Sequence, residues 1–316
     1  STQDYPGTDL YSTWCEIDLD TLSENVRALK KRGGTGFMAV VKANGYGHGL
    51  VPAARAARLG GADWLGVARL EEAVWLREGG LTGPILVLGY TAAQRAPEAA
   101  HFDISLAVYD RGLAAELNRQ AAGLGRKIKV HAKLDTGMGR LGEVAEDSQA
   151  LLTAVAGGEN LELEGMFTHF ARADEPERPE TADQIRRFSA AVRRAEETSL
   201  RPRWVHACNS AGTLYFPEAA FDMVRCGIAI YGLHPSNLAP LPAEVRPVLS
   251  WKARLISVKT LPAGHGVGYN HRYVTSGEER IGVIPAGYAD GFRRRLGNFA
   301  LVGGQRVNVA GGVCMD

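Results

Sequence analysis

The sequence predicts an α/β protein in which a (β/α)8 barrel is followed by a smaller, mainly β domain. The chain has 316 residues, of which 45% are hydrophobic and 22% charged, so it can form one barrel-sized domain and an additional piece. Between about residues 12 and 231, short apolar runs rich in Val, Ile and Leu alternate with amphipathic stretches. After residue 231 this alternation stops, and strand-like segments follow one another without helices.

The apolar runs predict eight strands, the number that a closed parallel barrel requires. Their alternation with amphipathic stretches is the pattern expected of βα units around a parallel sheet. An open, doubly wound sheet is the alternative that the same alternation allows. The predicted strands are residues 37–43, 64–68, 84–89, 103–108, 128–135, 163–169, 204–209 and 222–228.

The segments around these strands predict helices, because their apolar residues recur at helical spacing. Several of them end at Gly, as helices commonly do. The predicted helices are residues 19–32, 50–61, 69–80, 110–125 and 180–197.

A proline-rich linker at residues 235–247 separates the barrel from the predicted strands of the β domain. Those strands are residues 249–261, 280–287 and 299–311. We expect a barrel domain at residues 12–240 and a β domain at 241–316, with residues 1–17 as candidates to pack on the β domain.

Composition excludes several classes of partner. The 36 Lys and Arg nearly balance the 35 Asp and Glu and leave a net charge of +1, so nucleic acid is not an expected ligand. No apolar run approaches the roughly 18 residues of a membrane span, and the first ten residues contain no signal-peptide core. The cysteines (15, 208, 226 and 314) lack zinc-site spacing, which predicts free thiols and no metal site. A soluble cytoplasmic protein is expected.

Lys42 lies at the carboxyl end of the first predicted strand, in the segment VVKANGYGHG. An apolar site lowers the pKa of a lysine, and a neutral amine is what a carbonyl group or an aldehyde cofactor requires. A strand-end lysine that merely reaches solvent is the commoner case. Lys42 therefore becomes informative only together with other residues.

Further polar residues follow the fifth and sixth predicted strands. Lys133, Asp135 and Arg140 lie in KLDTGMGRLG, where the guanidinium could bind a carboxylate in a bidentate fork. Asp135 could instead form a structural ion pair with a neighbouring base. His169 follows the sixth strand, although a lone histidine is more often a structural group.

The seventh and eighth strands predict a phosphate site. Ser210 would begin a helix whose backbone N–H groups and hydroxyl could bind a phosphate, and Gly227 permits close backbone approach. Loops after strands seven and eight of such barrels often form a phosphate site. A lysine on strand one that faces a phosphate pocket suggests pyridoxal 5′-phosphate. In the β domain, tyrosines next to glycines have an ordinary explanation as interface residues.

Taken together, these segments resemble the alanine racemase family, whose members are pyridoxal-phosphate enzymes with an N-terminal barrel and a C-terminal β domain. The resemblance runs from about Trp14 to Asp316, and eight segments occur in the family's order and approximate spacing. They are AVVKANGYGHG, KLDTGMGRLG, THFARAD, HACNSAG, VRCGIAIYGL, GYNHRY, IPAGYADG and CMD.

The resemblance implies an activity with two bases. Lys42 would bind the cofactor covalently and act as the base for D-alanine, and Tyr269 from the partner subunit would act as the base for L-alanine. Two bases on opposite faces are what racemisation needs, because each delivers a proton where the other removed one. The functional unit would be a homodimer that supplies D-alanine for peptidoglycan.

The resemblance also implies the other site residues. Arg225 would face the pyridine nitrogen and keep it unprotonated, since a guanidinium retains its proton at ordinary pH. Lys133 matches a position that is carbamylated in many family members. The phosphate would be bound by Tyr46, Ser210, Gly227 and Ile228, the substrate carboxylate by Arg140 and Met315, supporting residues would be His169 and Asn209, and the entrance would contain Tyr288 and Asp316.

Family chains continue beyond the CMD segment, so we expect the β domain to be incomplete in this chain. The alternatives within the same fold are a broad-specificity or serine racemase and an amino-acid decarboxylase, although the HxGS-type motif of the decarboxylases is absent. From a different class, a non-catalytic carrier of pyridoxal phosphate would share the lysine, but the β domain with Tyr269 argues against it.

Overall fold

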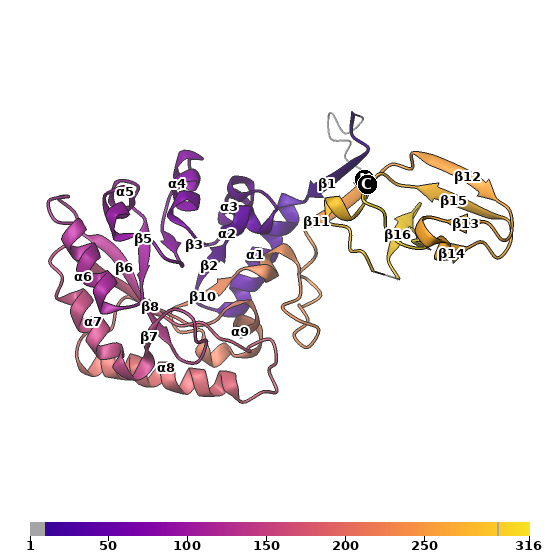
Figure 1. The fold of residues 1–316 in the computed structure, drawn as a ribbon. Coiled ribbons are helices and arrows are strands. Elements are labelled where there is room, and N and C mark those ends of the chain that lie inside the picture. Colours follow the sequence, from indigo (N-terminus) through magenta and orange to yellow (C-terminus); the bar gives the residue numbers. More distant parts are fainter. Residues whose placement is uncertain (1–9, 296) are drawn as a thin grey trace. The chain divides into compact units, whose positions relative to one another are not determined.

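The computed structural model describes residues 10–295 and 297–316 (Figure 1). They divide into two compact units. One comprises residues 17–248, and the other comprises residues 249–316 with the described part of the segment before residue 17. Residues 1–9, to which part of the prediction for the N-terminal segment refers, lie outside the described residues.

Eight parallel strands form the centre of the unit at residues 17–248, in the order β10-β2-β3-β4-β5-β6-β8-β9. Arg225 N donates a hydrogen bond of 2.9 Å to Cys208 O, which joins β10 to the residues after β9 and nearly closes the sheet. The predicted barrel is therefore confirmed, and the open sheet is excluded. The strands are β2 (Gly36–Val40), β3 (Trp64–Val67), β4 (Ile85–Val87), β5 (Ser105–Val108), β6 (Ile128–Asp135), β8 (Leu161–Phe167), β9 (Trp204–His206) and β10 (Met223–Cys226), and the short β7 (Glu143–Val144) pairs with β6.

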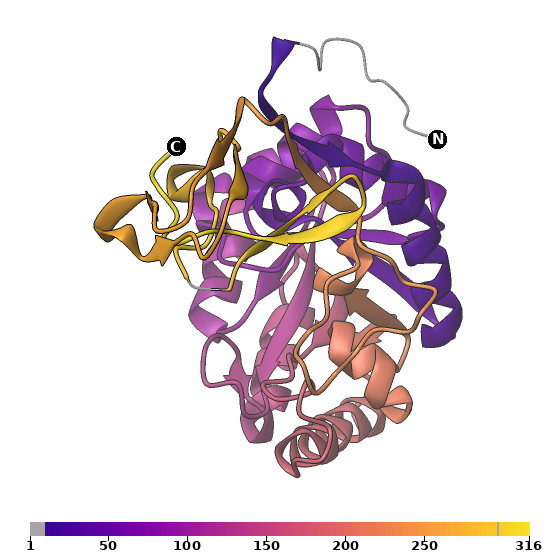
Figure 2. The ribbon, with the colours of Figure 1, turned by 90° about the vertical axis from the view of Figure 1, so that its right-hand side faces the viewer.

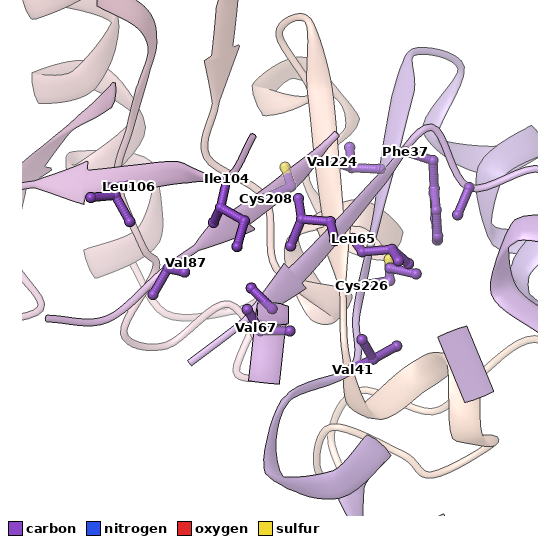
Figure 3. Packing of buried hydrophobic residues seen from close by; sticks show 14 of the residues in the cluster. Phe37, Val41, Leu65, Val67, Val87, Ile104, Leu106, Cys208, Val224 and Cys226 are labelled. Carbon is purple, nitrogen blue, oxygen red and sulfur yellow. The ribbon is translucent and has the colours of Figure 1, made fainter. Parts of the chain in front are cut away.

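Each barrel strand directs alternate side chains to opposite faces, because successive residues of a strand point to opposite sides. On β2, Phe37 and Ala39 belong to the large apolar cluster between strands and helices, whereas Met38 and Val40 belong to a smaller cluster with Trp64. Figure 3 shows the large cluster, which buries side chains from several strands. β6, β9 and β10 also carry buried polar side chains, of which Lys133 and Arg225 line the pocket described below.

The helices of this unit surround the strands, and the long α8, pink in Figure 2, lies on the outside. All five predicted helices are confirmed. The structure adds α5 and α7, which sequence analysis missed because both are short and apolar or alanine-rich, with weak periodicity. The helices are α1 (Leu19–Gly33), α2 (Lys42–Tyr46), α3 (Leu50–Leu59), α4 (Leu70–Glu78), α5 (Ala96–His101), α6 (Arg111–Gln120), α7 (Ser148–Ala156), α8 (Glu180–Glu197) and α9 (Ser210–Tyr215).

α2 is a left-handed turn that immediately follows Lys42. Ala43, Asn44, Gly45 and Tyr46 all have φ between 53° and 62°, which is unfavourable for residues other than glycine. The turn is held at both ends, since Ala43 N donates a hydrogen bond of 2.6 Å to Glu72 Oε1 and Leu50 N donates one of 2.9 Å to Asn44 Oδ1. No sequence pattern that we used predicts this turn.

The other unit consists of small two-stranded sheets. β12 (Ser257–Leu261) pairs with β15 (Glu279–Val283), β13 (Gly266–Val267) with β14 (Tyr273–Val274), and β16 (Phe299–Val302) with β17 (Gln305–Asn308), all antiparallel. β1 (Thr13–Ile17), which the sequence analysis did not predict, pairs with β11 (Leu249–Ala253). The predicted segment 249–261 is thus two strands. Short 3-10 helices include η5 (Ile228–Tyr231), η6 (Tyr269–His271) and η7 (Tyr288–Asp290).

Among the described residues, every helix is too short or too polar to cross a membrane.

Candidate active site

A pocket of about 440 Å³ opens at the carboxyl ends of the barrel strands, where barrels of this type carry their chemistry. All of its lining residues lie between residues 40 and 235, within the barrel unit. Ten of the residues singled out from the sequence line it: Lys42, Tyr46, Lys133, Arg140, His169, Asn209, Ser210, Arg225, Gly227 and Ile228.

Lys42 follows β2 at the point where the backbone enters the left-handed turn. The Glu72 carboxylate accepts hydrogen bonds from Ala43 N at 2.6 Å and from Ala68 N at 2.8 Å, which fixes the backbone beside the lysine. Burial lowers the pKa of Lys42, and the positive charges of Arg140 and Arg225 lower it further, against the opposing charge of Glu72. The amine is therefore more easily neutral than an exposed lysine.

Arg225 is 4% exposed and lies on the inward face of β10. Its Nη1 donates to His206 Nδ1 at 2.9 Å. Its Nη2 lies within hydrogen-bond distance of Thr168 O, Ala207 O and His169 Nδ1. Burial lowers the pKa of Arg225 to about 10, so it remains a cation near neutral pH. No hydrogen bond described here uses its Nε, and this donor remains for a ligand.

Ser210 and Gly227 lie side by side where β9 and β10 end. Ser210 Oγ accepts hydrogen bonds from Gly227 N at 3.1 Å and from Ala229 N at 3.3 Å. A Cβ on Gly227 would collide with the hydroxyl of Tyr46. Asn209 caps α9 by accepting from Gly212 N. The predicted helix start at Ser210 is confirmed, and hydroxyl and backbone N–H groups gather at one wall of the pocket.

Lys133 and His169 lie near other cations. Burial lowers the pKa of Lys133 to about 8, with further lowering by Arg140 and Arg225. Burial also lowers the pKa of His169 to about 3, again helped by the charges of Arg225 and Arg140. His169 is thus neutral over the physiological range, and Lys133 is partly neutral at pH 8.

Arg140 reaches the pocket from an exposed loop that Asp135 organises. The Asp135 carboxylate accepts backbone N–H hydrogen bonds from Gly137, Met138 and Gly139 at 2.9 to 3.1 Å. Burial opposes ionisation of Asp135, but these hydrogen bonds outweigh it and lower its pKa. The direct partners of this carboxylate are the N–H groups of the loop turn, and the charge of Arg187 lowers its pKa further.

The remaining predicted residues lie in the other unit. Tyr269 begins η6 and is 74% exposed. Tyr288 N donates to Cys314 O at 3.0 Å, and Ala289 N donates to Met315 O at 3.0 Å, which brings Tyr288 together with Met315 and Asp316. A Cβ on Gly287 would collide with the carbonyl of Met315, so glycine permits this approach.

Sequence analysis missed two buried histidines beneath the pocket, His131 on β6 and His206 on β9. His206 contacts Arg225 directly. The position of His131 could have been predicted from Lys133, because side chains two residues apart on a strand lie on the same face.

Comparison with known proteins agrees with this geometry. The family model "Alanine racemase, N-terminal domain" matches residues 17–235, and "Alanine racemase, C-terminal domain" matches residues 248–316. An alanine racemase of Symbiobacterium thermophilum is 47% identical over 307 residues, which cover 96% of this chain and 81% of that protein.

Solved structures give the same result. The alanine racemase of Streptomyces lavendulae superposes with a TM-score of 0.90 at 42% identity, over 96% of this chain and 82% of that one. A histidine racemase of Leuconostoc mesenteroides subsp. sake superposes with a TM-score of 0.87 at 33% identity, over 99% and 84% of the two chains. Since both family models and these relatives extend over most of the sequence, the chain belongs to the alanine racemase family.

Proposed function

We propose that this chain interconverts L- and D-alanine with pyridoxal 5′-phosphate bound in the barrel pocket. Residues 17–248 are then the cofactor-binding domain, and residues 249–316 supply residues for the substrate. The observation that carries the proposal is the composition of one pocket. A partly buried amine, a buried guanidinium and a wall of backbone N–H groups surround the same cavity, in a chain of the alanine racemase family.

The residues present fit this cofactor, on which the family depends. The amine that an aldehyde requires is Lys42, whose pKa is lowered by burial and by nearby cations. Tyr46, Ser210, Gly227 and Ile228 line the same pocket with hydroxyl and N–H groups suited to a phosphate, which would take the N–H of Gly227 in place of Ser210 Oγ. Ile228 is the first residue of η5, where N–H groups have no intrahelical partner. The unused Nε of Arg225 suits a ring nitrogen that accepts a hydrogen bond.

A bound pyridoxal phosphate would supply an aldehyde for the amino group of the substrate and a ring that withdraws electrons, which would make the Cα proton more acidic. Lys42 Nζ removes or returns that proton on one face of Cα, as the base for D-alanine. Tyr269 Oη does so on the other face, as the base for L-alanine. Inversion requires both, because each base delivers a proton to the face from which it removes one.

The other residues orient the substrate and the cofactor. Arg140 and the backbone N–H of Met315 bind the substrate carboxylate, and a guanidinium suits that group. Arg225 keeps the ring nitrogen unprotonated, because it retains its own proton. His169 is neutral and accepts from Arg225, and Asn209 fixes the start of α9 beside the phosphate. Lys133, as a carbamate, would give Arg140 a negative partner, and Tyr288 with Asp316 forms the substrate entrance.

We also propose that the enzyme works as a homodimer in the cytoplasm. Tyr269 would then act on the pocket of a second copy. The cysteines are free, including the exposed Cys15 and Cys314, which suits a reducing compartment.

A wider substrate range is the second candidate function. The structure that superposes at 33% identity is named a histidine racemase, so this barrel and β domain also occur around a larger side chain. Serine and broad-specificity racemases are the corresponding alternatives for this chain.

Reductive trapping followed by a racemisation assay tests the proposal. After loading with the cofactor and reduction with borohydride, peptide mapping should find the tag on Lys42, and the Lys42→Ala variant should lack it. The unreduced protein should convert each enantiomer of alanine into the other. A tag on another lysine, or colour without exchange of the α-hydrogen of alanine for solvent deuterium, would refute it. Serine and histidine assayed in parallel decide the substrate range.

A further inference from the structure

Beneath the pocket, a row of hydrogen bonds runs from Arg225 through the barrel interior to a carboxylate. Arg225 Nη1 lies 2.9 Å from His206 Nδ1. The other nitrogen of that ring, Nε2, lies 2.9 Å from His131 Nδ1. His131 Nε2 lies 3.2 Å from Glu164 Oε2, the end of the row. We call these four residues the relay chain.

The direction of every hydrogen bond in the relay chain follows from Arg225. A guanidinium has donors only, so Nδ1 of His206 must accept and a neutral ring carries its proton on Nε2. That proton points to Nδ1 of His131, which must accept as well and leaves its own proton on Nε2. The last donor therefore faces Glu164, which must accept.

Burial supports this assignment. It lowers the pKa of His206 well below the usual value, helped by the charge of Arg225, and it lowers the pKa of His131. Both rings are thus neutral, as the chain of donors requires. Burial raises the pKa of Glu164, but the hydrogen bonds from His131 and Ser105, together with nearby positive charge such as that of Lys129, outweigh this and leave it below its usual value. The carboxylate is ionised.

The fold is locally irregular where it accommodates the relay chain. Glu164 is an extra residue in β8, between the pairs Val130–Leu163 and His131–Gly165, and such a bulge redirects a side chain. A Cβ on Gly165 would collide with the ring of His131.

Aromatic contacts hold the two rings in place. Trp64 contacts His131 edge-on, with ring centroids 5.2 Å apart and 70° between the planes. Phe167 stacks on His206, with centroids 4.9 Å apart and 5° between the planes. The orientation of both rings is therefore fixed by packing.

The relay chain also supplies a partner for a buried charge. Among the described residues, no Asp or Glu forms an ion pair with Arg225, whose direct partners are backbone carbonyls and histidine nitrogens. A buried cation without an anion is costly. The carboxylate of Glu164, 14% exposed, is the anion to which its hydrogen bonds lead.

We propose that Glu164 is a positioning residue that acts on Arg225 through His131 and His206, polarising the intervening hydrogen bonds and strengthening the hold of Arg225 on its proton. Linked hydrogen bonds polarise one another in a low dielectric. The proposal rests on the proposed function only in that Arg225 faces the ring nitrogen of the cofactor. A strongly held proton keeps that nitrogen unprotonated and so limits side reactions.

The first test needs neither cofactor nor activity. In ¹⁵N-histidine-labelled protein, His131→Gln and His206→Gln variants assign the two rings among the eight histidines. Both rings should carry their proton on Nε2. In Glu164→Gln, which keeps an acceptor but loses the charge, both Nε2 protons should move upfield, that of His131 further. Glu162→Gln, an exposed change on the same strand, is the matched control and should shift neither. A proton on Nδ1 of either ring, or unmoved signals in Glu164→Gln, would overturn the proposal.

The second test uses the loaded enzyme. In Glu164→Gln, the rate of transamination relative to racemisation of alanine should rise by at least about twofold, the lower limit of the coupling between side chains of one network. Glu162→Gln should keep the wild-type ratio. A purely structural role for Glu164 would lower thermal stability and leave both the ratio and the proton signals unchanged, and that result contradicts the proposal. If the wild type did not racemise alanine, the proposed function would fail while the first test still decided the relay chain.

Discussion

Individual side chains give the pocket an excess of positive charge. The pKa values of Lys42, Lys133 and His169 are all lowered, first by burial and then by the guanidinium groups of Arg140 and Arg225. The arrangement disfavours protonation of the amines and the imidazole, while the two guanidinium groups remain charged. It therefore favours anionic groups such as a phosphate and a carboxylate, and it makes amines available as bases.

The first prediction concerns Tyr269. Tyr269→Phe should slow removal of the α-proton of L-alanine by about 100-fold or more, the usual effect of losing a general base. Deuterium should still enter D-alanine from solvent, because Lys42 is intact. Proton NMR of each enantiomer in D₂O measures the two rates. Equal losses for both enantiomers would contradict the assignment of two bases.

The second prediction concerns Lys133. Because its pKa is about 8, the neutral amine becomes more abundant as the pH rises through 8. That amine can attack carbon dioxide, forming an N–C bond and releasing a proton. With ¹³C-bicarbonate at pH 8, a carbamate signal should appear in the ¹³C spectrum and disappear in Lys133→Met. Lys31→Met, an exposed control, should retain it, and the same signal in both variants would refute carbamylation of Lys133.

At the scale of elements, the left-handed turn α2 decides how Lys42 is presented. Three residues of this turn other than glycine have positive φ, each at a cost of roughly 1–2 kcal/mol. Glu72 and Asn44 hold the turn by the hydrogen bonds described above, and the hydroxyl of Tyr46, at the end of the turn, occupies the space beside Gly227 that a Cβ there would need. The turn thus links the amine to the wall that we assign to the phosphate.

The third prediction compares two glycines with nearly equal φ. Gly45 has φ +62° and lies in the turn, where a Cβ would approach Ala53 Cβ to 3.1 Å; Gly34 has φ +65° and open space around it. Both Gly→Ala changes should lower the free energy of unfolding by about 1 kcal/mol through the backbone. Gly45→Ala should lower it further and weaken cofactor binding, measured by fluorescence titration. Equal cofactor affinity in the two variants would show that the turn does not position the site.

Sequence patterns predicted the elements whose signal is local. The run at 37–43 predicted β2, and the amphipathic spacing at 180–197 predicted α8 with both ends correct. The pocket residues could be predicted because strand ends of one barrel meet at one rim. The turn after Lys42 and the bulge at Glu164 could not, because both depend on tertiary contacts, with Glu72 and with His131. β1 was missed since its partner, β11, lies far along the chain.

At the scale of the molecule, buried neutral histidines make the stability sensitive to acid. The pKa of His169 is lowered to about 3 from 6.5, and the pKa values of His131 and His206 are lowered too. As the pH falls below 6.5, these histidines therefore become protonated in the unfolded chain before they do in the folded chain. The stability that the neutral rings contribute is fully present above pH 6.5 and is lost on acidification toward pH 3.

The fourth prediction follows from that sign. Between pH 6.5 and 5, the free energy of unfolding should fall with decreasing pH, by up to about 1.4 kcal/mol per pH unit for each histidine. Urea unfolding at several pH values measures how steeply the free energy of unfolding falls with pH. His169→Gln should reduce this slope by the contribution of about one histidine. His101→Gln, at an exposed site, is the matched control. An unchanged slope in His169→Gln would contradict the neutral assignment of His169.

The fifth prediction tests the homodimer. If Lys42 and Tyr269 of one site come from different subunits, Lys42→Ala and Tyr269→Phe chains should each be inactive alone. When the two are co-expressed, half of the dimers are hybrids and each hybrid has one intact site, so about one quarter of the wild-type activity should return. A mixture without recovered activity would place both residues of a site in one subunit.

The pairing of β1 with β11 also has a consequence for biosynthesis. Thr13 Oγ1 donates a hydrogen bond to Lys252 O, 239 positions later in the sequence, so β1 of a nascent chain leaves the ribosome before its partner. At about 5–20 residues per second, that partner emerges roughly ten seconds to a minute afterwards. Throughout this interval the unpaired edge is accessible to chaperones and to neighbouring nascent chains, whereas the intervening barrel can already fold.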